Sequence, residues 1–169
     1  MSLFNLFRPK AELVRDKKGN VVAISPAELD DILRTQQKVV SNVYILKNDP
    51  EFYLVTEQCM EKFLRWAKVH NIPRVGNPPI KNSKGVYIMH DCDGYRGILY
   101  GKMKEFLYPA LAAGMLEGRG TMIRDGHPEL HAWDWFVNEH KKLKWIEPTR
   151  KRDWIYDPDF NRPVYFVMT

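Results

Sequence analysis

Cys92 is the residue of this chain whose surroundings best suit covalent chemistry. It lies in the segment HDCDGYRG (90–97), between two aspartates and directly after a short apolar run. A core cysteine would sit among apolar residues, and a disulfide or structural-metal cysteine would have a second cysteine nearby. The residues after Cys92 show helical spacing, so Cys92 is expected at a helix start, where unpaired N–H groups and the helix dipole favour a thiolate. The pattern therefore predicts a nucleophilic thiol.

This thiolate needs a cationic partner, because the flanking Asp91 and Asp93 oppose its negative charge. Histidine is the usual partner of a nucleophilic cysteine. The segment HAWDWFV (131–137) has the composition of a strand and supplies His131. We therefore expect Cys92 and His131 to lie within hydrogen-bond reach, directly or through one water.

The strand that follows offers a carboxylate for this histidine. If residues 138–140 form the turn of a hairpin, Glu147 lies opposite His131 and Trp145 lies opposite Trp133. Directly opposed Cβ atoms are about 5 Å apart, which is close enough for a carboxylate–imidazole hydrogen bond. The spacing therefore predicts that Glu147 orients His131.

Three sequence blocks resemble the transglutaminase-like superfamily of papain-fold thiol enzymes. They are CDGYRGILYGKM, HAW and WIEPT, which occur in the family's order within residues 86–149. The resemblance implies that Cys92 is the nucleophile, that His131 is the general base and acid, and that Glu147 orients the imidazole where the family usually has aspartate. Four aromatic residues are candidates for the substrate groove: Tyr87, Tyr95, Trp133 and Trp145. Asn82, Lys84 and Tyr87 are alternative oxyanion donors.

The first half of the chain contains the patterns of a hairpin and two helices. Residues 12–25 read as two short strands around a DKKGN turn. Ser25, followed by Pro26, starts a helix with an N-cap and a proline at the first helical position. A second helix is expected from Asp49-Pro50, with a stripe of apolar side chains that makes Cys59 a buried core residue.

The second half reads as a loop (71–85), the cysteine-bearing helix, and four strands. The strands are expected at 120–124, 131–137, 143–148 and 163–168. This order favours an α+β fold with a mostly antiparallel sheet. Together with the resemblance, it predicts a transglutaminase-like (papain-like) core in residues 49–169, with the cysteine helix on the sheet and an N-terminal hairpin and helix extension in residues 1–48.

Composition excludes several other classes of protein. With 169 residues, 44% hydrophobic and 12% aromatic, the chain has the content of one globular domain. No apolar run approaches the roughly 20 residues of a membrane span, and no signal peptide is apparent, so a cytoplasmic or intracellular location is expected. The net charge of +5 permits an acidic partner. The basic clusters lack interleaved aromatic residues, so nucleic acid is not the expected partner.

No cofactor and no metal are expected. Two cysteines exclude a disulfide framework and fit a reducing compartment. A zinc site formed by Cys92, His127 and His131 is disfavoured, because metal sites normally add ligands at short spacing.

Two functions from different classes follow. The first is a cysteine enzyme that performs acyl transfer on amide bonds of a protein or peptide substrate, with peptide cleavage, deamidation and cross-linking left open. The second is a catalytically silent fold that serves as a structural or interaction subunit of a larger assembly, of which a phage particle is one setting. That subunit would dock through the N-terminal extension and the aromatic tail (153–169), and exposed Trp154, Tyr156 and Phe160 would favour it.

Overall fold

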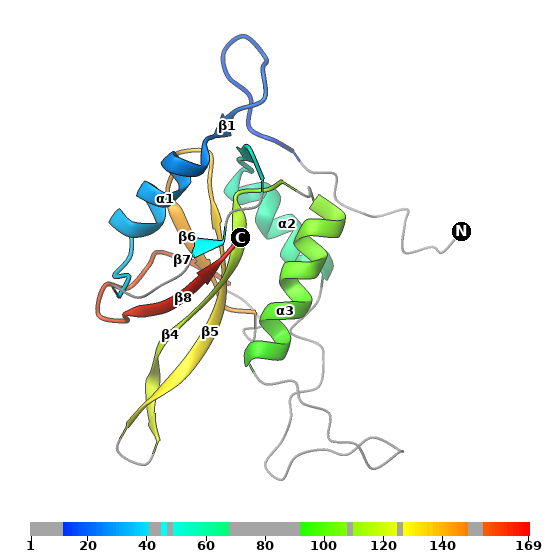
Figure 1. Ribbon diagram of the computed structural model, residues 1–169. Helices are drawn as coiled ribbons and strands as arrows, with labels where there is room; N and C mark the ends of the chain where they lie inside the picture. The colour runs from blue at the N-terminus through cyan, green and yellow to red at the C-terminus, as the bar shows by residue number, and fades with distance from the viewer. Residues whose placement is uncertain are drawn as a thin grey trace.

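A six-stranded sheet organises the chain (Figure 1). The computed structural model describes residues 12–40, 45–46, 49–67, 92–107, 110–124, 127–148 and 154–169. The strand order is β2-β8-β4-β5-β6-β7, in which β2 and β8 are parallel and all other neighbours are antiparallel. The strands are β2 (Ile45–Leu46), β8 (Val164–Met168), β4 (Ala113–Arg124), β5 (His127–Val137), β6 (Leu143–Ile146) and β7 (Ile155–Tyr156). The long β4–β5 hairpin forms the centre of this sheet and extends beyond its neighbours (Figure 1).

The N-terminal strands form a second, two-stranded sheet. Strand β1 (Ala23–Ile24) pairs with β3 (Phe52–Tyr53) in antiparallel register. The predicted turn is present, because Asp16 Oδ1 accepts hydrogen bonds from the backbone N–H groups of Lys18 and Asn20, and Gly19 adopts a φ of 85°. The predicted hairpin is thus correct at its turn, but β1 takes its partner from a segment outside the hairpin.

Three α-helices accompany the sheets in the described residues. Helix α1 (Pro26–Thr35) has the predicted N-cap, since Ser25 Oγ accepts from the N–H of Glu28 at 3.2 Å. Helix α2 (Glu57–Ala67) does not start at Asp49-Pro50 as predicted. Strand β3 intervenes, and Thr56 Oγ1 caps the helix by accepting from the N–H of Cys59. The sequence signal for this start is the threonine, a residue preferred at N-caps.

Helix α3 (Cys92–Lys102) begins at the residue that the sequence pattern places at a helix start. It continues as a short π-helix, η3 (Met103–Leu107), and packs against β5 and β4. Figure 1 shows α1 on one side of the large sheet and α3 on the other. The core is correspondingly divided, because alternate side chains of β5 point to opposite faces: Trp133 and Trp135 pack with α1, and Phe136 packs with α2 and α3.

The predicted fold class is wrong. The described chain is organised by its β-sheets, with eight strands and few helices, and not as a papain-like α+β core with an appended extension. The predicted N-terminal extension is part of the fold, since α1 covers the large sheet and β2 is one of its strands. The short sequence blocks behind the resemblance specify local helix and strand starts, and local starts do not fix topology. The boundary between residues 1–48 and 49–169 stays a prediction.

None of the helices described here has both the length and the apolar character that a membrane span requires.

Candidate functional site

The β5–β6 pairing differs from the predicted register by two residues. Trp135 pairs with Trp145 and Val137 pairs with Leu143, so the turn contains residues 138–142 and not 138–140. Lys141 within this turn has a φ of 57°, a left-handed conformation that is uncommon outside glycine. Because the shift is an even number, each side chain keeps its predicted face of the sheet.

The structure brings His131 and Glu147 together. The His131 ring lies with Nε2 2.6 Å from Oε2 of Glu147, whose carboxylate accepts the hydrogen bond. In the observed register Glu147 follows β6 at a position diagonal to His131, and its longer side chain spans the offset. The two side chains remain 23% and 10% exposed, so this hydrogen bond lies at the border between core and solvent.

Trp133 and Trp145, hereafter the tryptophan pair, pack next to this hydrogen bond. Their rings stack with centroids 5.0 Å apart, and the His131 ring meets Trp133 edge-on at 4.6 Å. Both indoles are fully buried, and Trp145 Nε1 donates to Oε1 of Gln37 at 2.9 Å. Both candidates for the substrate groove are thus core residues in this structure, with polar groups at their edge.

Arg162 is the site residue that the sequence analysis missed. Its guanidinium carbon lies 4.1 Å from the ring centroid of Trp133 and 5.8 Å from that of Trp145, within cation–π distance. The Nε of Arg162 donates to the backbone oxygen of Arg119 at 3.2 Å. Residues 157–163 (DPDFNRP) are rich in turn-forming residues, but only the tertiary structure places this loop over the tryptophan pair.

Gly118 allows this loop to approach the sheet. A Cβ atom on Gly118 would lie 2.5 Å from the backbone oxygen of Pro163, closer than real Cβ contacts. Gly118 pairs with His131 across β4 and β5, and the neighbouring Arg119 N–H donates to that same Pro163 oxygen at 2.9 Å. The glycine therefore brings Arg162 and His131 to one region of the molecule. We call the group of His131, Glu147 and Arg162 the open end of the β5–β6 hairpin.

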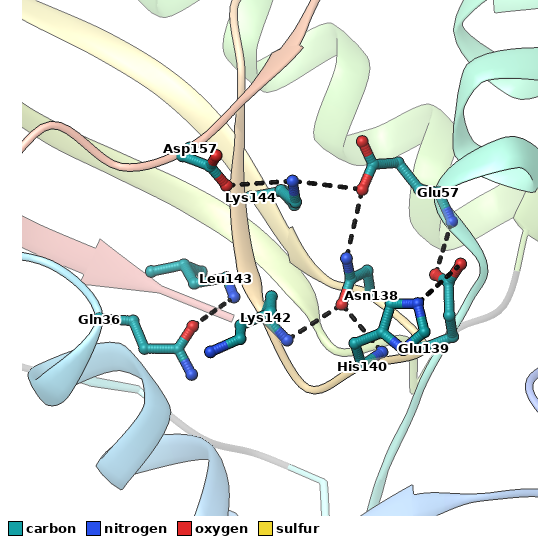
Figure 2. Close-up of polar contacts among 9 residues, drawn as sticks. All are labelled: Gln36, Glu57, Asn138, Glu139, His140, Lys142, Leu143, Lys144 and Asp157. Atoms are coloured by element: carbon teal, nitrogen blue, oxygen red, sulfur yellow. Dashed lines mark hydrogen bonds and ion pairs between the residues drawn. The ribbon is translucent and has the colours of Figure 1, made fainter.

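The turn end of the same hairpin (residues 138–144 with Glu57) is organised by Asn138 (Figure 2). Its Oδ1 accepts from the backbone N–H groups of His140 and Lys142, each at 3.0 Å, and its Nδ2 donates to Oε2 of Glu57 at 3.2 Å. Glu139 Oε2 accepts from the backbone N–H of Glu57 at 2.9 Å and so caps the start of α2 from another element.

Lys144 completes the turn end. Its Nζ lies 3.3 Å from Oε2 of Glu57 and 3.0 Å from Oδ1 of Asp157 (Figure 2). Burial lowers the pKa of Lys144, but the hydrogen bonds and charges of the two carboxylates outweigh it, and the net shift is upward. The polar groups here satisfy one another, which is typical of a structural network.

The opposite face of β5 carries an unusual carboxyl group. Asp134 is fully buried, and neither of its carboxyl oxygens has a hydrogen-bond partner among the described residues. Burial raises the pKa of Asp134 well above its ordinary value; the charge of Arg96 opposes this shift and that of Glu147 adds to it. Arg96 itself pairs with Glu117 at 2.7 Å, which holds the first turns of α3 against β4.

The two cysteines are placed differently. Cys59 is buried as predicted, and burial raises the pKa of its thiol. Cys92 is the first residue of α3, but its side chain and that of Tyr95 lie outside the described residues, as does all of Tyr87. The predicted approach of Cys92 to His131 therefore stays a prediction.

Within the described ranges, no three histidine, cysteine or acidic side chains are grouped so that they could hold a metal ion.

Comparison with known proteins identifies a fold and no family. No protein-family model matches the chain, and no curated protein is significantly similar to it. Two solved structures are similar at TM-score 0.64 and 14% sequence identity. The PSL1a–E64 complex is matched over 92% of this chain and 56% of its own chain. A lectin of Polyporus squamosus bound to the epitope Neu5Acα2-6Galβ1-4GlcNAc is matched over 88% and 50%. This chain thus spans about half the length of the proteins it resembles.

These findings correct the functional predictions. The two structures described above are those of a lectin, and no family model supports the transglutaminase-like family. The predicted cysteine acyl-transfer enzyme is therefore corrected, while the grouping of Cys92 with His131 and Glu147 stays a prediction. The three matching blocks were too short to distinguish a shared activity from shared local elements.

The alternative of an assembly subunit is also not supported as stated. Exposed tail aromatics would favour it, but Trp154 and Tyr156 are partly buried and pack against the core. Phe160, at 55% exposure, is the member of the three that faces solvent.

Proposed function

We propose that this chain is a carbohydrate-binding protein and that the open end of the β5–β6 hairpin is its site. The observation that carries this proposal is the 2.6 Å contact between His131 and Glu147 at the partly exposed border of the tryptophan pair. The protein or peptide partner expected from sequence is replaced by a sugar.

The chemistry of the open end supports a ligand rich in hydroxyl groups. A sugar hydroxyl both donates and accepts hydrogen bonds, so it can bridge a carboxylate and an imidazole. Small-molecule sites typically combine apolar walls with a few placed polar groups that fix the ligand's orientation. Here the buried tryptophan pair does not face the ligand but supports the polar groups, since the Trp133 ring packs against His131 and holds it in place.

The comparisons support the same class of ligand. The structural neighbours are lectin structures, and one of them is bound to a sialylated N-acetyllactosamine. The fold alone does not define a binding site, so the proposal depends on the open end and not on the likeness.

The test is isothermal titration of the purified chain with N-acetyllactosamine (Galβ1-4GlcNAc), followed by the variants His131→Gln and Glu147→Gln. We expect saturable binding to the wild type. Each variant should weaken the affinity about tenfold or more, because a hydrogen bond to a charged group contributes roughly 1.5–3 kcal/mol. Circular dichroism checks that each variant is folded.

His140→Gln is the matched control, because this histidine is 77% exposed at the turn end of the same hairpin. Its affinity should equal that of the wild type. Absence of binding to this sugar and to a panel of neutral and acidic glycans would refute the proposal. Rapid alkylation of Cys92 at pH 6 that depends on His131 would also contradict it, because that result indicates a thiol activated for chemistry.

A further inference from the structure

We infer that the sugar bound at the open end carries a carboxylate, and that Arg162 is the residue that recognises it. This inference rests on the proposed function and adds to it the chemical class of the ligand.

Arg162 is a fixed cation with donor groups left over. Its Nε–H is used by the backbone oxygen of Arg119, and its plane lies over the tryptophan pair. Among the described residues, no carboxylate forms an ion pair with Arg162. The carboxylate of the nearby Glu147 instead accepts from His131. The terminal Nη groups therefore lack an acidic partner in the part of the chain that the structure describes.

The acidic residue nearest to Arg162 in sequence does not fill this role. Asp159 Oδ1 accepts from the backbone N–H of Asn161 at 2.9 Å, and the Asp159 backbone oxygen accepts from the N–H of Arg162. Asp159 thus shapes the turn that carries Arg162. Fixing the backbone in this way reduces the entropy that the arginine would lose on binding a ligand.

The remaining donors suit a planar anion. The two Nη groups of a guanidinium form a fork that matches the two oxygens of a carboxylate. A preformed, partly buried arginine with this geometry binds a carboxylate more strongly than an exposed lysine does, because less solvation and less side-chain freedom are lost. The net charge of +5 favours the approach of an acidic ligand.

The experiment compares three sugars that share one backbone: N-acetyllactosamine, its 6-O-sulfated form, and Neu5Acα2-6Galβ1-4GlcNAc. Titration calorimetry on the full chain should show the sialylated sugar binding about tenfold more tightly than the neutral one, with the sulfated sugar between them. Arg162→Gln should reduce the acidic sugar to the affinity of the neutral one. Arg162→Lys should keep part of the preference, since it retains charge but loses the fork.

Arg34→Gln is the matched control, because Arg34 is an exposed arginine of α1 that pairs with Asp30. It should leave both affinities unchanged.

Equal affinity for neutral and sialylated sugars, or a preference that survives Arg162→Gln, would overturn this inference while leaving the proposed function intact. Sulfate binding as tight as carboxylate binding would overturn the carboxylate assignment. If Arg162→Gln does not fold, the ratio of the affinities for the sialylated and the neutral sugar in Arg162→Lys decides. Failure of these three sugars and of the glycan panel to bind the wild type refutes the proposed function itself.

Discussion

The two ends of the β5–β6 hairpin use polar residues in opposite ways. At the turn end, Asn138 and Lys144 have their polar atoms committed to Glu57, Asp157 and the turn backbone. At the open end, Arg162 retains donors that no described carboxylate accepts. Polar networks in which every group has a hydrogen-bond partner stabilise a fold. Polar groups that are held in place but have remaining donors suit a ligand. The difference supports a structural role for the turn end and is the basis for proposing that a ligand binds at the open end.

The largest expected effect is at the turn end, in Asn138→Leu. The change removes three side-chain hydrogen bonds at a buried position and leaves two turn N–H groups without their acceptor. We expect a loss of about 2–4 kcal/mol in the free energy of unfolding, measured by urea denaturation.

Glu57→Gln is the matched variant, because it leaves both hydrogen bonds of Asn138 Oδ1 to the turn intact and still offers an amide oxygen to Asn138 Nδ2. It should cost less than Asn138→Leu. A cost below about 1 kcal/mol for the leucine variant would break the comparison, since the turn end would then contribute little stability.

A smaller loss is expected at the open end, in Gly118→Ala. The new methyl group would press on the Pro163 backbone and move the loop that carries Arg162. We expect a loss of about 1–3 kcal/mol in the free energy of unfolding, together with a loss of the preference for acidic sugars.

Gly101→Ala provides the control for this substitution. Gly101 is in α3, and a Cβ atom there meets nothing within 4 Å. Alanine at that position should raise the free energy of unfolding by about 0.5–1 kcal/mol, through helix propensity alone, and leave sugar binding unchanged. An unchanged sugar preference in Gly118→Ala would show that the loop's approach does not position Arg162.

The smallest expected effect is at Asp134. This residue tests whether the lack of a hydrogen-bond partner is by itself the mark of a ligand-binding site. Its pKa is raised in the folded state by burial, so the folded protein holds a proton that the unfolded chain releases above about pH 4. The stability that comes from the neutral carboxyl is complete below that pH and is lost as the pH rises toward the folded pKa. Asp134→Asn removes this loss and should be more stable than wild type by about 1–2 kcal/mol at pH 7.

The measurement is the unfolding free energy of both proteins from pH 3 to pH 8. The gain should shrink toward zero near pH 3, where the wild-type carboxyl is neutral in both states. Asp31→Asn, at an exposed position of α1, should show no such trend. If the difference in unfolding free energy between Asp134→Asn and wild type does not depend on pH, the carboxyl is not held neutral. If Asp134→Asn binds sugar more weakly, Asp134 belongs with the open end.

Local patterns predicted much of the secondary structure and part of the site. Ser25 and Pro26 mark the start of α1, and alternation along HAWDWFV predicts which side chains of β5 share a face. The His131–Glu147 contact is present although the register was wrong, because a shift of two residues preserves the face and a glutamate spans the diagonal. The start of α2 was misplaced because Asp49-Pro50 carries the composition of a helix start, while Thr56 performs the capping.

The sequence by itself determined the start of α1, the strand character of β5, β6 and β8, and which face of β5 carries His131 and the tryptophan pair, because these depend on neighbours within a few positions. Only the tertiary structure decided that Arg162 lies over Trp133, that Glu139 caps α2, and that β2 pairs in parallel with β8. Each of these contacts joins segments far apart in the chain. Such contacts depend on how loops close and how whole faces pack, and no local period in the sequence encodes that choice.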